Sequence, residues 1–147
     1  MLLEYATDFV DYGILGILIL MSIISLWLFI ERMMFFKSVD ISKYTNRDKL
    51  ELDLSDNINT ISAIGSNAPY VGLLGTVLGI MLTFYTLGDI GAVDAKKIMT
   101  GLAMALKATA TGLFVAIPSI VFYTILNRKI EKILTYFDIE NENKIDG

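Results

Sequence analysis

The side chains of this chain that could do chemistry are hydroxyls, lysines and carboxylates, because its 147 residues include no histidine and no cysteine. An imidazole base, a thiol nucleophile and a zinc site of the usual ligand types are therefore excluded. Three threonines, Thr76, Thr83 and Thr109, lie in long stretches without a charged residue. A hydroxyl in such surroundings can hold a proton or an ionisable side chain by hydrogen bonding. These threonines are candidates for lining a narrow polar passage.

Lys107 is the second candidate, and its role depends on where its helix begins. If the helix begins close to Lys107, the ammonium reaches the outer interface of a membrane. If the helix begins near Asp94, Lys107 lies below the surface, on one face with Thr100, Met104 and Thr111. A buried ammonium there requires a carboxylate partner. Because the uncharged stretches hold no carboxylate, we expect that partner to belong to another subunit.

The elements that must position these side chains are three stretches without Asp, Glu, Lys or Arg, at residues 12–30, 57–88 and 108–127. As helices, the first and third would extend about 28 and 30 Å, which matches the hydrocarbon core of a bilayer. The apolar part of the second begins near Ala68. Hydrophobic residues make up 54% of the chain, and its mean hydropathy is +0.60. The sequence therefore predicts an all-α integral membrane protein.

We expect a single domain over residues 1–147, with three transmembrane helices and short helical extensions outside the membrane. Its predicted parts are a first span at about 12–30, a cytoplasmic loop at 31–65, a second span at about 68–88, a third span at about 98–127 and a cytoplasmic tail at 128–147. In the tail, Ile130, Ile133, Leu134 and Phe137 follow the repeat of an amphipathic helix. From Asp138 onward we expect irregular structure.

Basic residues predict the orientation. Nine of them lie in the predicted loop and tail: Arg32, Lys37, Lys43, Arg47, Lys49, Arg128, Lys129, Lys132 and Lys144. The positive-inside rule then places the N-terminus outside and the C-terminus in the cytoplasm. Residues 1–30 contain no basic residue, so we expect the first span to be retained rather than cleaved as a signal peptide.

Composition also excludes several classes of function. The net charge of −4 argues against nucleic acid as a partner. No segment outside the spans is large enough for a soluble catalytic domain, so we expect no enzymatic activity, and we expect neither a cofactor nor a metal. The partners left are membrane lipid and other proteins.

Small residues recur along the second and third spans at helical spacing. They form two stripes: Gly72, Thr76, Gly79, Thr83 and Thr86 in the second span, and Gly101, Ala105, Thr109, Gly112, Ala116, Ser119 and Tyr123 in the third. In lipid, helices associate through such residues. The stripes could therefore be tight contacts within one subunit, with hydroxyls bonded one turn back, or the walls of a polar passage. The bulkier first span is the best candidate for contact with lipid.

Two prolines interrupt these patterns. Pro118 lies inside the third span, where its ring should kink or loosen the helix and could form a hinge. Pro69 is expected in the first turn of the second helix, a position that proline fits.

Two motifs carry a resemblance to a known family. The segments at residues 64–81 (IGSNAPYVGLLGTVLGIM) and 101–113 (GLAMALKATATGL), followed by Ala116-Ile117-Pro118, resemble the MotA/TolQ/ExbB proton-channel family, and its ExbB members most closely. The resemblance implies an inner-membrane protein with a periplasmic N-terminus that assembles as a homo-oligomeric ring, usually a pentamer. It also implies an ExbD-like partner, whose helices lie inside the ring and whose aspartate carries protons. The energy of proton flow would be transmitted through a TonB-like protein and would drive outer-membrane uptake of iron-siderophores, cobalamin or metals.

The resemblance also assigns residues. It implies that Thr76 and Thr109 line the interior and hydrogen-bond the partner's aspartate, and Pro118 and the glycines match as well. The family commonly has a glutamate where this chain has Met104, and an apolar residue where it has Lys107. The partner's aspartate would then be the only titrating carboxylate in the membrane, or Lys107 would set its pKa.

Two other functions fit these features. A TolQ-like subunit for cell-envelope maintenance shares the motifs. A non-conducting membrane scaffold would use the small-residue stripes for packing alone. A flagellar stator subunit fits less well, because it needs four spans and a larger cytoplasmic domain.

Overall fold

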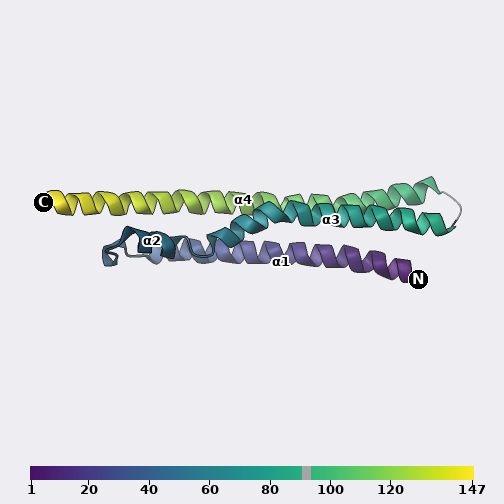
Figure 1. The fold of residues 1–147 in the computed structure, drawn as a ribbon, viewed down its shortest axis with the longest axis horizontal. Helices are drawn as coiled ribbons and strands as arrows, with labels where there is room; N and C mark the ends of the chain where they lie inside the picture. Colours follow the sequence, from purple (N-terminus) through teal and green to yellow (C-terminus); the bar gives the residue numbers. More distant parts are fainter. Residues whose placement is uncertain (91–93) are drawn as a thin grey trace.

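The computed structural model describes residues 1–90 and 94–147, and this part of the chain is helical and contains no strand. Its elements are α1 (Leu2–Ser38), a short 3-10 helix η1 (Ile41–Lys43), α2 (Arg47–Leu54), α3 (Ile58–Ile90) and α4 (Ala95–Asp146). Figure 1 shows α1, α3 and α4 aligned along one long axis, with α3 running opposite to the other two. The final part of α4 extends past the end of α1, so the C-terminus lies alone at one end of the molecule.

The three long helices confirm the prediction of three membrane-crossing elements, since each is long and apolar enough to cross a bilayer. With 37, 33 and 52 residues, they would extend about 55, 50 and 78 Å. A hydrocarbon core is about 30 Å thick, so each helix continues well beyond it. Each of the three helices is thus long enough to cross a bilayer and to continue beyond its hydrocarbon core.

Side-chain caps and one unusual backbone angle fix where the helices begin. Asn46 accepts a hydrogen bond from the Asp48 amide at 2.8 Å and caps α2. Asp94 accepts one from the Lys96 amide at 3.0 Å and caps α4. Between α2 and α3, Asn57 has a φ of 61°, a left-handed conformation that asparagine tolerates better than most residues. These local signals separate the short α2 from the long α3.

The helices extend farther than the sequence predicted at two places. α3 begins at Ile58, inside the predicted loop at 31–65, where a short separate helix was expected rather than the start of the second long helix. α4 continues to Asp146, so the expectation of irregular structure from Asp138 onward is wrong. Asp138 pairs with Arg47 of α2, and Lys144 lies 3.6 Å from Glu140 one turn earlier. Both contacts favour helix at the end of the chain.

Both prolines lie inside helices. Pro69 is in the interior of α3, not in its first turn as predicted, because α3 starts eleven residues earlier, at Ile58. Proline has no amide hydrogen to donate to the carbonyl one turn back, which favours a bend. Figure 1 shows α3 changing direction in its first half, where it passes from α1 to run along α4. Pro118 lies within α4, which is assigned as a single helix from end to end.

The buried apolar side chains form two clusters. The mid-span cluster joins all three long helices and comprises Ile14, Leu18, Ile64, Ala68, Val115 and Ala116. The loop-end cluster adds α2 and comprises Leu28, Leu50, Leu54, Ile58, Ile61, Leu126, Ile130, Leu134 and Phe137. It includes three of the four residues of the stripe predicted in the tail, and Ile133 packs against it. Most other large apolar side chains of α1 are exposed, as they are on a helix that faces lipid.

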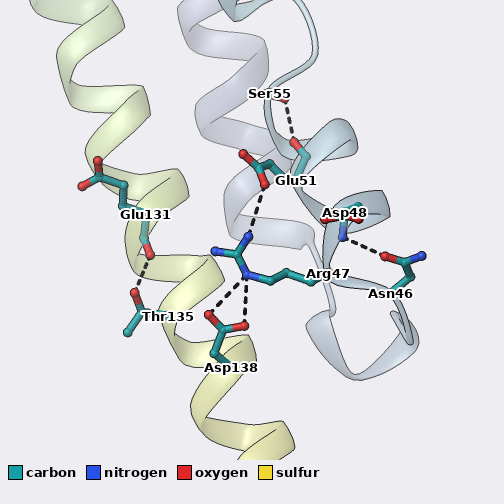
Figure 2. Close-up of polar contacts among 8 residues, drawn as sticks. All are labelled: Asn46, Arg47, Asp48, Glu51, Ser55, Glu131, Thr135 and Asp138. Atoms are coloured by element: carbon teal, nitrogen blue, oxygen red, sulfur yellow. Dashed lines mark hydrogen bonds and ion pairs between the residues drawn. The ribbon is translucent and has the colours of Figure 1, made fainter.

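Ion pairs and hydrogen bonds hold α2 beside α4 at the loop end. Figure 2 shows Arg47 reaching from the start of α2 to Asp138 of α4, with its Nε 3.1 Å from one carboxylate oxygen. The same guanidinium lies 3.3 Å from Glu51, one turn along α2. These side chains are about half exposed, so each pair contributes little energy alone. Their main effect is to orient α2 over the loop-end cluster.

Candidate functional site

Thr76 of α3 and Thr109 of α4 are brought together, with their hydroxyls in hydrogen-bond contact. Thr76 is 7% exposed, and its hydroxyl also donates to the Ala105 carbonyl oxygen at 2.9 Å. Ala105 precedes Thr109 by four residues, so its carbonyl is the one to which a threonine at 109 would ordinarily bond within its own helix. The Thr76 hydroxyl therefore donates to the carbonyl oxygen that the Thr109 hydroxyl would otherwise use.

The hydroxyl pair can be bonded in either direction, because each hydroxyl has one hydrogen and can also accept. When Thr76 donates to the Ala105 carbonyl oxygen, Thr109 donates to the Thr76 oxygen. The Thr109 oxygen keeps its capacity to accept, and its side chain is only partly buried. The pair thus presents a hydrogen-bond acceptor at the edge of the α3–α4 interface.

Thr83 lies two turns from Thr76 on α3 and does not join the pair. Its hydroxyl donates to the Gly79 carbonyl oxygen at 2.8 Å, one turn back in the same helix. Its side chain packs against Gly101 of α4, where an added Cβ would lie 2.6 Å from the Thr83 hydroxyl oxygen. Thr83 therefore acts in this structure as a packing residue that is partly exposed.

The glycines of the two stripes let the backbones of α3 and α4 meet. A Cβ on Gly72 would lie 2.6 Å from the Ala108 carbonyl oxygen, and one on Gly112 would lie 2.6 Å from that of Ala68. A Cβ on Gly79 would lie 2.9 Å from the Ala105 side chain. The stripes are thus tight contacts within one chain, which is one of the two interpretations that the sequence left open. The threonine pair lies in this contact between Gly72 and Gly79.

Pro118 is nine residues beyond Thr109 on α4, and its side chain is exposed. Next to it, Ser119 is buried and lies 2.8 Å from the Ser25 hydroxyl of α1. Ser119 also donates to the Val115 carbonyl oxygen at 2.9 Å. This serine pair joins α1 to α4 in the interior. Ser119 belongs to the small-residue stripe predicted in the third span, whereas the only signal for Ser25 was a small residue in an uncharged stretch.

Lys107 lies beside carboxylates of its own chain. α4 begins at Ala95, so Lys107 is more than three turns into the helix. It lines a cavity of about 150 Å³ between α1 and α4, together with Asp8, Asp11 and Met104. Neither carboxylate is within 4 Å of the ammonium, so their attraction acts across the cavity.

This arrangement bears on the expectation for the Lys107 partner. The sequence predicted a carboxylate from another subunit, because the three uncharged stretches of this chain contain none and the first of them starts at Tyr12. α1 in fact begins at Leu2 and carries two aspartates on the face toward α4. The signal was present in the sequence: Asp11, Ile14 and Leu18 follow one another at steps of three and four residues, and the last two are buried. Extending the helical repeat backward would have found it.

A buried arginine at the other end of α1 was also missed. Arg32 is 4% exposed, and its guanidinium donates to Glu31 at 2.6 and 2.5 Å and to the Asp53 carbonyl oxygen at 2.8 Å. It also lies 4.5 Å from the centre of the Phe35 ring. Asp53 in turn accepts a hydrogen bond from Tyr44 at 2.7 Å, which raises the pKa of that phenol. This network fastens the loop and α2 to α1.

Comparison with known proteins adds independent information. The MotA/TolQ/ExbB proton channel family matches residues 30–139 of this chain. A biopolymer transport protein of Helicobacter pylori, ExbB-like 2, is 54% identical over 132 residues, which cover 90% of this chain and 88% of that protein.

Two further relatives extend the comparison. The biopolymer transport protein ExbB of Aquifex aeolicus is 48% identical over 142 residues, which cover 96% of each chain. The Tol-Pal system protein TolQ of Pseudomonas aeruginosa is 37% identical over 93 residues, which cover 63% of this chain and 40% of that protein.

Proposed function

Because this chain belongs to the MotA/TolQ/ExbB proton channel family, we propose that it is an ExbB-type subunit that converts proton motive force into work. In this proposal its copies form a ring, with five as the expected number. The ring surrounds the transmembrane helices of an ExbD-like partner, and a TonB-like protein passes the work to outer-membrane uptake of iron-siderophores, cobalamin or metals. The N-terminus faces the periplasm and the C-terminus the cytoplasm, as the nine basic residues of the loop and tail favour.

The observation that carries this proposal is the contact between the Thr76 and Thr109 hydroxyls at the α3–α4 interface. When the partner's carboxyl group is protonated, its hydrogen bonds to the Thr109 oxygen, Thr109 donates to Thr76, and Thr76 donates to the Ala105 carbonyl. Every polar group in that chain of bonds has a partner. An unpaired polar group in an apolar medium costs several kcal/mol.

The same two hydroxyls can also hydrogen-bond the ionised carboxylate of the partner. Rotating the two hydroxyls lets Thr109 donate to the carboxylate and Thr76 donate to Thr109. The Ala105 carbonyl keeps its bond within the helix. Two hydroxyls can therefore accommodate both protonation states by rotation alone, without movement of a helix, because a hydroxyl both donates and accepts.

The carboxyl group itself must come from the partner. All 16 carboxylates of this chain lie outside the three uncharged stretches. Met104, at the position where the family resemblance leads one to expect a glutamate, is apolar and lines the cavity beside Lys107. We propose that the partner's aspartate is the titrating group of the membrane.

Isosteric removal of the hydroxyls tests the proposal. Thr76→Val and Thr109→Val should abolish energy-dependent uptake in a strain that lacks the native subunit, while co-purification with the ExbD-like partner is retained. Thr124→Val is the matched control, because Thr124 is an exposed threonine of α4 that bonds only to the Ile120 carbonyl among the described contacts. Wild-type uptake by the double variant would favour the scaffold interpretation, in which the small-residue contacts are packing alone.

A TolQ-like role in cell-envelope maintenance is the second candidate, supported by the similarity to the Pseudomonas aeruginosa protein. Expression of this chain in two strains, one lacking its ExbB and one lacking its TolQ, separates the two roles. Restored siderophore uptake supports the ExbB-type role. Restored resistance to detergent without restored uptake supports the other.

A further inference from the structure

Three lysines gather where α1 and α4 continue beyond their uncharged stretches. Lys37 is in the last turn of α1, and Lys129 and Lys132 lie three residues apart on α4. Together with Phe36 and Ile133 they line a cavity of about 200 Å³ between the two helices. Among the residues that the structure describes, none of these ammonium groups lies within 4 Å of a carboxylate. The cavity therefore carries positive charge that no direct ion pair neutralises among the described residues.

The sequence predicts that the cavity lies at the depth of lipid headgroups, because its lysines follow closely on an uncharged stretch. Lys129 and Lys132 follow the end of the third uncharged stretch, at Asn127, by about 3 and 7 Å along the helix. The headgroup layer is roughly 5–7 Å thick on each side of the hydrocarbon core. Trp27, near the end of the uncharged stretch of α1, is 65% exposed and marks the same interface. Lys37 lies deeper in the water, and its flexible stem can return the ammonium toward the membrane.

We propose that this cavity binds the phosphate of an anionic phospholipid. The three ammonium groups supply the charge, and Phe36 and Ile133 supply an apolar wall that lowers the local dielectric and strengthens the attraction. Basic pockets between transmembrane helices suit such headgroups. A membrane lipid fits better than soluble phosphate, because the depth of Lys129 and Lys132 matches the plane in which lipid phosphates are already concentrated.

The test measures which phospholipids remain with the complex of this protein and its partner after extraction in mild detergent. The site variant combines Lys37→Gln, Lys129→Gln and Lys132→Gln. The matched control combines Lys43→Gln, Lys49→Gln and Lys144→Gln, which removes the same charge from exposed lysines of the loop and tail. Mass spectrometry of the extracted lipid compares phosphatidylglycerol with phosphatidylethanolamine.

Wild type and control should retain phosphatidylglycerol in excess of its share in the membrane, and the site variant should not. Affinity should fall about fivefold for one lysine and up to about a hundredfold for all three. The corresponding triple Lys→Arg variant should keep the lipid, which separates loss of charge from misfolding. Equal retention by the site variant and the wild type would overturn the proposal.

Two further arms identify the source of the ligand. Excess inorganic phosphate should leave the lipid bound, and displacement by phosphate would overturn the lipid assignment in favour of the free ion. Cross-linking of Lys129 to an acidic segment of the partner, with no retained anionic lipid, would overturn it in favour of a protein ligand. Because neither arm needs a proton gradient, this test can fail while the proposed channel function holds, and the reverse is also true.

Discussion

α4 makes two interfaces of opposite character. Beside Thr109 it meets α3 through glycines and hydroxyls, so close that added Cβ atoms would lie 2.6 Å from backbone oxygens. At the loop end it meets α1, α2 and α3 through bulky side chains such as Leu54 and Leu126, both of which are fully buried. The first interface is built from small residues, and the second is built from large apolar ones.

We expect this difference when the first interface lies in lipid and the second lies in water. Within a bilayer, apolar side chains gain nothing by leaving lipid, so helices associate through close backbone contact and hydrogen bonds. Beyond the hydrocarbon core, water returns and burial of large side chains stabilises the fold. A polar pair such as Thr76 and Thr109 is therefore kept where the packing is tightest, and the stability of the projecting helices rests on a conventional core.

Removing a large side chain from the loop-end cluster should have the largest effect on stability. Leu54→Ala leaves a cavity among fully buried neighbours and should lower the free energy of unfolding by about 2–5 kcal/mol. The thermal midpoint of the purified protein in detergent measures this change. Leu52→Ala, at a side chain that is 72% exposed, should leave the midpoint nearly unchanged. Equal thermal midpoints for the two variants would contradict the role of the buried loop-end cluster in stabilising the protein.

Adding a single carbon to the α3–α4 contact should have the next largest effect. Gly112→Ala places a Cβ against the Ala68 backbone and should cost about 1–3 kcal/mol, because backbone atoms cannot rotate away. Gly13→Ala is the control, since nothing lies within 4 Å of its added Cβ. If Gly112→Ala were as stable as the control, the two helices would be farther apart than described here. The same assay serves for both.

The smallest effect is expected at the cavity of Lys107. Asp11→Asn and Lys107→Met should each lower stability by less than about 1 kcal/mol, and the double variant should lose less than the sum, because the two charges attract. Uptake separates this local role from a role toward the partner's aspartate. If Lys107 sets the pKa of that aspartate, Lys107→Met abolishes uptake and Asp11→Asn does not restore it. Wild-type uptake by Lys107→Met would exclude the partner role.

Much of the fold could be predicted because lipid imposes simple rules on sequence. Long uncharged stretches located the three crossing helices, and the spacing of Gly72 and Thr76 with Thr109 and Gly112 identified the faces that meet. These features depend on periodicity within one helix. What could not be predicted depends on helix ends, since no charge or composition rule stops a helix where it leaves the bilayer.

The residues that could not be predicted from the sequence lie near the ends of the uncharged stretches or of the helices. Asp8, Asp11 and Arg32 lie just outside the uncharged stretches, and Ile58 begins α3 ten residues before the predicted second span at about 68–88. The burial of Arg32 depends on Asp53, a residue twenty-one positions away whose carbonyl faces it only after α2 has packed. Pairing across such a distance is set by tertiary structure rather than by local pattern.

The unbroken course of α4 has a mechanical consequence. Thr109 and Phe137 belong to one helix, separated by about 42 Å of rise. A tilt of about 5° at the level of Thr109 would carry Phe137 sideways by about 4 Å, less than the width of one helix but more than a side-chain contact tolerates. We therefore expect α4 to convert a small tilt at the level of Thr109 into a larger displacement at Phe137.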